Sequence, residues 1–229
     1  MDINFEKFTG LAELYDSARP SYADAAVSYI LTNLAPPNPV VADVGAGTGK
    51  FSEQLAPLVN KLYAIEPNAD MREKLTAALA KFPNSAVVGA SAESTALPDS
   101  SVDLVVCAQA FHWFDPGRFR AECSRILKPG GQIAIVYNSH SYPRSPNVET
   151  RELICSLFFG GAFLRAAFPN PTQYDRDGWL TYMMSHSDSP RFGDANYESF
   201  VEDQLAQFDS ESYDGIYTMQ LSTHVFSKL

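Results

Sequence analysis

Cysteine is scarce in this sequence, and its three copies, Cys107, Cys123 and Cys155, lie far apart. None of the paired spacings that zinc and redox sites need is present, so the sequence predicts neither a metal site nor a disulfide framework. We therefore expect a protein of a reducing compartment, the cytoplasm. Long apolar runs are also missing: the longest, such as 133–137, have the length of a strand, and the first residues do not resemble a signal peptide. Neither secretion nor contact with a membrane is expected.

Basic residues are few, with 17 Lys and Arg against 27 Asp and Glu. A nucleic-acid partner is therefore disfavoured, because nonspecific affinity for phosphates depends on clustered Lys and Arg. The charge is uneven: residues 116–174 hold seven Lys or Arg and three acids, whereas residues 175–229 hold three and ten. The composition favours a small-molecule partner. It leaves open whether the basic stretch is a solvated surface or an anion-binding side of the protein.

Short β-branched or apolar runs alternate with segments of helical periodicity between residues 40 and 136, which is typical of parallel strands joined by crossover helices. The expected strands are 40–44, 62–66, 86–90, 102–108 and 132–137, and the expected helices lie near 50–58, 70–81 and 119–127. This pattern predicts an α/β fold with a doubly wound sheet. The length favours a single domain over 1–229, with a helical arm or lid at 1–38, a cofactor-binding core at 39–138 and a substrate-side part at 139–229.

Weaker patterns flank this core. Ser21 is placed to cap a helix that runs to about residue 34, in an arm expected to cover the carboxyl edge of the sheet. After the core, residues 148–159 and 197–208 have the spacing of helices. Residues 216–226 alternate between apolar and polar side chains, and we expect them to form a closing edge strand.

Three glycines, Gly45, Gly47 and Gly49, follow the first strand directly and precede a helix. A ligand approaches the backbone closely only where Cβ atoms are missing, and open α/β sheets bind ligands at the carboxyl ends of their strands. The spacing is G-x-G-x-G. A dinucleotide fingerprint would need glycine in place of Lys50, and a P-loop would need Ser or Thr in place of Phe51. A nucleotide-type site is favoured, with a tight turn that binds nothing as the alternative.

Glu66 strengthens this interpretation. It ends the second expected strand, 23 residues after Asp43, and is followed by Pro67. A carboxylate at that place can accept hydrogen bonds from both hydroxyls of a ribose. A lone acid at a strand end is often only solvated, but together with the glycine loop it favours a nucleoside ligand.

With these motifs in this order, the sequence resembles the class I S-adenosylmethionine-dependent methyltransferases over most of its length. Residues 43–49 resemble the family's first motif, 64–67 its ribose-binding acid, and 127–131 the turn before its fifth strand. The resemblance implies S-adenosylmethionine as cofactor. It also implies a sheet of order 3-2-1-4-5-7-6 with the last strand antiparallel.

The resemblance also implies which residues meet the cofactor. Residues 89–93 and 97–99 resemble the segment that contacts adenine, although Ser91 stands where the family usually has Asp, which leaves the backbone N–H of Ala92 to meet the ring. Asp43 is expected to orient the glycine loop and reach the cofactor's ammonium group. The complete set of expected cofactor residues is Asp43, Gly45, Gly47, Gly49, Glu66, Pro67, Ser91, Ala92, Gln109, Trp113, Tyr15 and Arg19.

A narrower resemblance concerns the methyl acceptor. Residues 14–22 and 108–114 are similar to the branch that includes trans-aconitate methyltransferases, which suggests a carboxylate or another oxygen acceptor. We expect Tyr22 and Arg144 to contact the acceptor, and Arg19 to bind a carboxylate of cofactor or acceptor unless it pairs with Asp16.

Methyl transfer from a sulfonium is an in-line displacement, so the enzyme mainly aligns the reactants and excludes water. A carboxylate needs no proton removed, whereas an alcohol or a phenol needs a general base. His112 is the expected base, with a purely orienting role as its alternative. The sequence thus predicts O-methylation of a small carboxylate. The alternatives are base-assisted O-methylation of a phenol or alcohol, a protein that binds S-adenosylmethionine without turnover, and a nucleotide-binding oxidoreductase.

Overall fold

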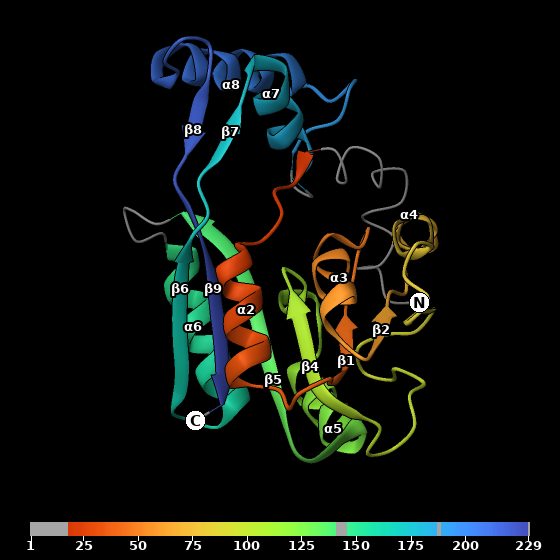
Figure 1. Ribbon diagram of the computed structural model, residues 1–229. Coiled ribbons are helices and arrows are strands. Elements are labelled where there is room, and N and C mark those ends of the chain that lie inside the picture. The colour runs from red at the N-terminus through yellow and green to blue at the C-terminus, as the bar shows by residue number, and fades with distance from the viewer. Residues whose placement is uncertain (1–17, 141–145, 187–188, 229) are drawn as a thin grey trace.

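A seven-stranded mixed sheet forms the centre of the protein in the computed structural model, which describes residues 18–140, 146–186 and 189–228 (Figure 1). The strand order is β3-β2-β1-β4-β5-β9-β6, and β9 is antiparallel to both of its neighbours. Because β9 is the seventh of these strands along the chain, the predicted α/β fold and its order 3-2-1-4-5-7-6 are confirmed. In sheet order the strands are β3 (Ser85–Val88), β2 (Lys61–Ile65), β1 (Val40–Val44), β4 (Val102–Ala108), β5 (Leu127–His140), β9 (Leu221–Lys228) and β6 (Phe163–Pro169).

Helices cover both faces of this sheet, which explains why its parallel strands are apolar on both sides. The helices are α2 (Asp24–Asn33), α3 (Lys50–Leu55), α4 (Ala69–Leu79), α5 (Pro116–Ile126) and α6 (Pro146–Phe159), with 3-10 turns η2 (Ala56–Leu58) and η3 (Phe111–Trp113). Side chains alternate along β4: Leu104 and Val106 pack with α2, α3 and α4, whereas Val105 and Cys107 pack with α5 and α6. The three cysteines are buried and free. Among the described residues, no helix combines the length and the apolar character needed to cross a membrane.

The predicted core elements agree with the structure except at β5, which is expected over 132–137 but runs from Leu127 to His140, so the expected turn at 127–131 is the first part of this strand. Strands β1 and β4 have the expected bounds, and β2 and β3 begin one residue earlier than expected. Helix α5 begins three residues earlier, at Pro116, because Asp115 caps it through a hydrogen bond from the backbone N–H of Arg118 (2.8 Å).

Two flanking predictions are wrong. Ser21 does not cap α2: the N-cap position is Ala23, whose N–H donates to Thr223 Oγ1 (2.9 Å), and the carbonyl of Ser21 accepts from Asn138 Nδ2 (3.1 Å). The segment 216–226 does not form an edge strand either, because β9 lies between β5 and β6. The true edge, β6, is rich in alanine and carries an arginine, so its strand propensity is weak.

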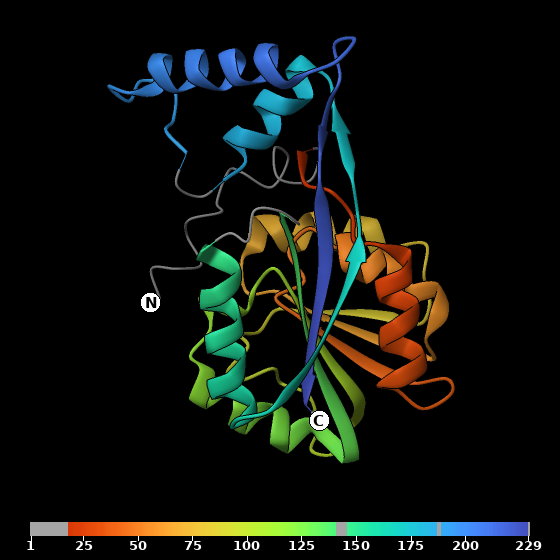
Figure 2. The ribbon, with the colours of Figure 1, turned by 90° about the vertical axis from the view of Figure 1, so that its left-hand side faces the viewer.

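A small cap stands over the carboxyl ends of the parallel strands, as Figure 2 shows. It consists of the ribbon β7 (Thr172–Tyr174) and β8 (Tyr217–Met219) with the helices α7 (Arg176–Met184) and α8 (Tyr197–Glu211). Its own apolar cluster includes Tyr174, Trp179, Tyr182 and Phe208. Strand β7 follows β6 after two residues, and β8 precedes β9 by one residue. The cap is therefore connected to the sheet through these two strands. Of these four elements, α8 is predicted by the sequence and β8 lies within the expected strand 216–226, whereas β7 and α7 are not predicted.

His224 of β9 is a polar residue buried under α6. Its ring is 5% exposed, Nδ1 lies 3.1 Å from the Arg165 guanidinium, and Nε2 has no hydrogen-bond partner among the described residues. Arg165 also pairs with Glu152. Burial, and then the charges of Arg165 and Arg151, lower the pKa of His224 to about 4.

We expect His224 to make stability depend on pH. Because its pKa is lowered on folding, the unfolded chain binds the proton more tightly between about pH 6.5 and pH 4. The free energy of unfolding should therefore fall as pH falls through this window, by about 3 kcal/mol at most from this group. His224→Asn keeps an acceptor for Arg165 but does not titrate, so its curve should be flatter.

Urea unfolding of both proteins at half-unit steps from pH 7.5 to pH 4 measures this effect. The difference between the two curves cancels every other titrating group. Parallel curves would show that His224 is not held neutral.

Candidate active site

The glycine loop between β1 and α3 has a left-handed backbone at all three glycines, with φ of 73°, 58° and 103°. A Cβ on Gly45 would lie 2.5 Å from the Cβ of Ala110, and one on Gly49 would lie 2.9 Å from Leu75 Cδ1. A Cβ on Gly47 would meet no atom of the described residues within 4 Å. Gly45 and Gly49 therefore allow the loop to pack against the protein, whereas at Gly47 the described residues leave space beside the backbone.

Glu66 joins the glycine loop to the end of the neighbouring strand β2. Its Oε2 accepts from the N–H of Gly47 (2.9 Å), and its Oε1 accepts from the N–H of Asn68 (2.8 Å). Burial raises the pKa of Glu66, while these two N–H groups and the charge of Arg72 act in the opposite direction. The expected ribose-binding acid thus lies at the loop, with its carboxylate fixed in orientation by two backbone donors.

Asp43, at the end of β1, is fully buried beneath the loop. Its Oδ2 accepts from Ser52 Oγ (2.6 Å), but Oδ1 has no partner among the described residues, and the same holds for Thr48 Oγ1. Burial raises the pKa of Asp43 to about 7, Ser52 lowers it, and the charge of Glu66 raises it further. Buried polar atoms are nearly always hydrogen-bonded, so these two mark a place suited to a polar or cationic ligand group.

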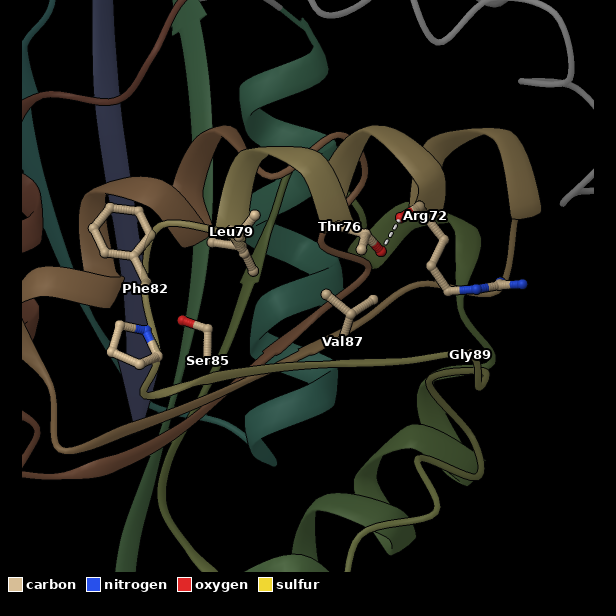
Figure 3. A pocket seen from close by; sticks show the side chains of 9 residues that line it. Arg72, Thr76, Leu79, Phe82, Ser85, Val87 and Gly89 are labelled. Atoms are coloured by element: carbon tan, nitrogen blue, oxygen red, sulfur yellow. Dashed lines mark hydrogen bonds between the residues drawn. The ribbon is translucent and has the colours of Figure 1, made fainter.

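Arg72 of α4 fixes the chain after Glu66. Its Nη1 donates to the carbonyls of Glu66 (3.0 Å) and Pro67 (2.8 Å), so Pro67 contributes through its backbone. Figure 3 shows the Arg72 side chain next to Gly89, at one end of a hollow between α4 and β3. This hollow lies along the outer edge of the sheet, beside β3, whereas the glycine loop comes directly after the central strand β1 in the chain.

The segment expected at the adenine follows β3. Ala92 is buried in one cluster with Val44 and Ile65, the last residues of β1 and β2, and Ser91 is half-buried. Further along, Glu122 of α5 accepts from both the N–H (2.7 Å) and the hydroxyl (2.6 Å) of Thr95. Its bond with Arg125 is the main reason that the pKa of Glu122 falls to about 2. The segment is therefore anchored and lies beside the two strand ends.

Gln109 and the 3-10 turn η3 follow the end of β4. Gln109 has a φ of 54°, and its side-chain amide donates to the carbonyl of Asn138 (2.9 Å), which ties the ends of β4 and β5 together. Phe111 is buried, with its ring centroid 4.8 Å from that of Phe158, so it serves packing. Trp113 is half-buried and lies beside His112.

His112 has two guanidinium groups in its surroundings. Part of His112 is exposed to solvent, but the surrounding protein also removes water from around its ring. This desolvation first, and then the charges of Arg151 and Arg19, lower the pKa of His112 to about 4. Its ring centroid lies 6.1 Å from that of Tyr137, and the guanidinium of Arg151 lies 4.4 Å from the same Tyr137 ring. His112 is therefore neutral at pH 7 and a weak base.

Other expected acceptor residues have different surroundings. Arg19 contacts the cap: its Nη2 donates to the carbonyl of Ser185 (3.2 Å), and its Nη1 lies 3.4 Å from His186 Nε2. Tyr22 is buried, with its ring centroid 4.8 Å from that of Phe51. Tyr15, Asp16 and Arg144 lie outside the described residues.

Arg151 is a residue that the sequence analysis missed. Helical periodicity places it on the same face of α6 as Cys155 and Phe158, four and seven residues later, and both of these are buried. An arginine on the apolar face of a predicted helix is the signal that identifies it. No group of three His, Cys, Asp or Glu side chains in the described part of the chain is arranged to hold a metal ion.

Comparison with known families and proteins adds to this geometry. Residues 42–135 match the family model described as a methyltransferase domain. The chain is 37% identical over 139 residues to an uncharacterized methyltransferase of Mycobacterium bovis, which covers 61% of this chain and 54% of that protein. It is 34% identical over 107 residues to the malonyl-[acyl-carrier protein] O-methyltransferase of Methylococcus capsulatus, covering 45% of this chain and 39% of that protein. The chain spans about half the length of the curated relatives it matches first.

Solved structures with this fold include the YcgJ protein of Bacillus subtilis, with a TM-score of 0.60 and 20% identity over 89% of this chain and 96% of that one. The geranyl diphosphate C-methyltransferase of Streptomyces coelicolor, solved with S-adenosyl-L-homocysteine, has a TM-score of 0.51 and 14% identity over 89% and 77%. The fold of this chain is the Rossmann-like fold of class I methyltransferases, and its core from 42 to 135 matches their domain model.

The glycine loop gives a matched pair of variants. Both Gly45 and Gly47 have a left-handed backbone, where any Cβ costs about 1–2 kcal/mol. Only Gly45→Ala adds overlap with Ala110, for which overpacking typically costs about 1–3 kcal/mol more. We expect Gly45→Ala to lower the free energy of unfolding clearly further than Gly47→Ala in urea titrations. Equal losses would contradict the difference in their surroundings.

Proposed function

We propose that this protein is an S-adenosylmethionine-dependent methyltransferase that O-methylates a carboxylate of a small molecule. The observation that carries the proposal is the pairing of Glu66 with the N–H of Gly47, beside the open space over that glycine. A carboxylate held against this loop would be in position to accept hydrogen bonds from a ribose. The domain match and the S-adenosyl-L-homocysteine bound to a protein of the same fold support the same cofactor.

The residues present fit that cofactor. Glu66 keeps lone pairs on both oxygens for the ribose hydroxyls, and Gly47 presents backbone without a side chain. The unpartnered Oδ1 of Asp43 suits the ammonium group of the methionine part, directly or through water. Ser91 and Ala92 would lie toward the adenine, and Trp113 toward the reacting end. The cofactor supplies an electrophilic methyl group on a sulfonium.

The environment of His112 favours a carboxylate over a neutral hydroxyl acceptor. A phenol has an unperturbed pKa near 10, so a histidine with a pKa of about 4 is a poor base for it. A carboxylate is already ionised at neutral pH. The charges of Arg19 and Arg151 attract such an anion to the neighbourhood of His112. The resemblance of residues 14–22 and 108–114 to the trans-aconitate methyltransferases, and the relative that acts on a malonyl-[acyl-carrier protein], support the same acceptor class.

Removing the Glu66 carboxylate should weaken cofactor binding. Glu66→Ala loses two charge-assisted hydrogen bonds to the ribose, which corresponds to about 2–4 kcal/mol, or about 30- to 1,000-fold in affinity. Because Glu66 also holds the N–H groups of Gly47 and Asn68, Glu66→Gln is the gentler variant, since it keeps one acceptor oxygen.

Calorimetry with S-adenosylhomocysteine measures this loss, and thermal unfolding of each variant accounts for any change in the fold. Glu53→Gln removes an exposed carboxylate from the neighbouring helix α3 and should bind normally. Affinity within threefold of the parent in Glu66→Ala would refute the ribose site. Binding of NAD without binding of S-adenosylhomocysteine would refute the proposal that the cofactor is S-adenosylmethionine.

The acceptor class can be tested at His112. If the acceptor is a carboxylate, His112→Asn should lower turnover by less than about tenfold, whereas loss of a general base typically costs about 10²–10⁴-fold. Mass spectrometry of products from small carboxylates, phenols, alcohols and amines identifies the acceptor. Methylation of neutral hydroxyl compounds alone, with a loss above about a hundredfold in His112→Asn, would favour base-assisted O-methylation. Cofactor binding without turnover of any compound would favour a non-catalytic binding protein.

A further inference from the structure

Arg151 carries a charge that no carboxylate balances within the described part of the chain. It is half-buried on α6, where burial lowers its pKa, and it makes no hydrogen bond or ion pair with another described residue. Its guanidinium carbon lies over the Tyr137 ring, 4.4 Å from the ring centroid. The acid that follows it, Glu152, is paired with Arg165 instead. A guanidinium stacked on an aromatic face keeps its N–H donors at the edge for a planar anion.

The titratable groups around Arg151 come from several elements and include Tyr182 of α7, which acts on the pKa of Arg151. Tyr137 of β5 and Cys155 of α6 have pKa values raised by burial, and those of His112 and His224 are lowered to about 4. The second cation that acts on His112 is Arg19, which contacts the cap. Two guanidinium groups thus act on one imidazole, and among the described residues no acid acts with them as a cause of its pKa shift.

The position of Arg151 agrees with a role toward the acceptor. Helix α6 begins at the end of the sheet over which the cap stands, as Figure 2 shows, and Arg151 lies in its first half. Tyr137 and η3 are at the carboxyl ends of β5 and β4, next along the sheet from the glycine loop after β1. Arg151 therefore belongs to the same edge of the sheet as the cofactor residues, displaced toward β5.

We propose that Arg151 binds the carboxylate of the methyl acceptor and so determines specificity for an anion. This inference rests on the proposed function and names the residue that selects the acceptor. In the transfer, a carboxylate oxygen forms a bond to the methyl carbon while the bond from that carbon to sulfur breaks, and its electron pair stays on sulfur. The sulfonium becomes a neutral thioether and the carboxylate a neutral ester. Arg151 then loses its anionic partner, which favours release of the product.

Binding of a simple carboxylate tests this proposal, whichever acceptor the protein methylates. Protein saturated with S-adenosylhomocysteine is titrated with sodium acetate, malonate or succinate, and the His112 ring is followed by NMR. A bound anion should raise the pKa of His112, because a nearby negative charge favours imidazolium. Malonamide and succinamide, the neutral analogues, should leave it unchanged.

Variants then assign the effect to Arg151. Arg151→Met should weaken binding of the carboxylate at least tenfold, and Arg151→Lys should restore part of it, since a point charge replaces a planar fork. In the free protein, Arg151→Met should also raise the pKa of His112, because a repelling charge is gone. Arg120→Met removes the same charge from an exposed site on α5 and should match the parent.

The result that overturns the proposal is an affinity for these carboxylates that is equal in the parent and in Arg151→Met, or the absence of any binding by the three anions. Normal binding of S-adenosylhomocysteine in every variant confirms that the fold and the cofactor site are intact. Failure to bind S-adenosylhomocysteine in the parent would instead contradict the proposed function itself, so the two failures are distinguishable.

Discussion

The hydrogen bond from the N–H of Gly47 to Glu66 depends on one constraint, the parallel pairing of β1 with β2. That pairing sets Val44, the last residue of β1, beside Ile65, the last residue of β2. The two strands therefore end side by side, and the loop after β1 contacts Glu66, the residue after β2. A carboxylate held there by two N–H groups lies beside Gly47, the glycine of this loop at which a Cβ would meet no described atom. The position of the proposed cofactor site thus follows from strand register, and the buried Asp43 under the loop follows from the same strand.

The sequence predicts this part of the molecule well because its signals are local. Apolar runs of strand length, the glycines after β1 and the acid after β2 do not depend on distant contacts, and the predicted bounds of β1 to β4 agree with the structure to within a residue or two. The different surroundings of the three glycines, in contrast, cannot be predicted from local sequence. All three are expected at the cofactor, yet the overlap of a Cβ at Gly45 with Ala110 is visible only once β4 is placed beside β1.

The cap and the acceptor side could not be predicted to the same extent. Strand β6 is a weak strand by composition, and its place at the edge depends on the antiparallel insertion of β9 from some fifty residues later. Arg19 is expected to bind a carboxylate, and its contacts with Ser185 and His186 arise from a helix that the sequence does not predict. Arg151 has a local signal, but its neighbours Tyr137 and His112 lie on other elements.

The charges of the two sides are opposite, which agrees with the anionic acceptor proposed for this acidic protein. Asp43 and Glu66 place carboxylates at the glycine loop, where a sulfonium cofactor would lie, whereas Arg19 and Arg151 place cations around His112. Burial raises the pKa of both acids, so a cationic ligand that needs their ionised form would compete with protons, and its binding would lower both pKa values. Under the proposed function, both reactants would be bound as ions, and the transfer would remove the charge of the sulfonium and of the reacting carboxylate together. The ammonium group of the cofactor keeps its charge, so the contact proposed for Asp43 would remain in S-adenosylhomocysteine, whereas Arg151 would lose its anionic partner.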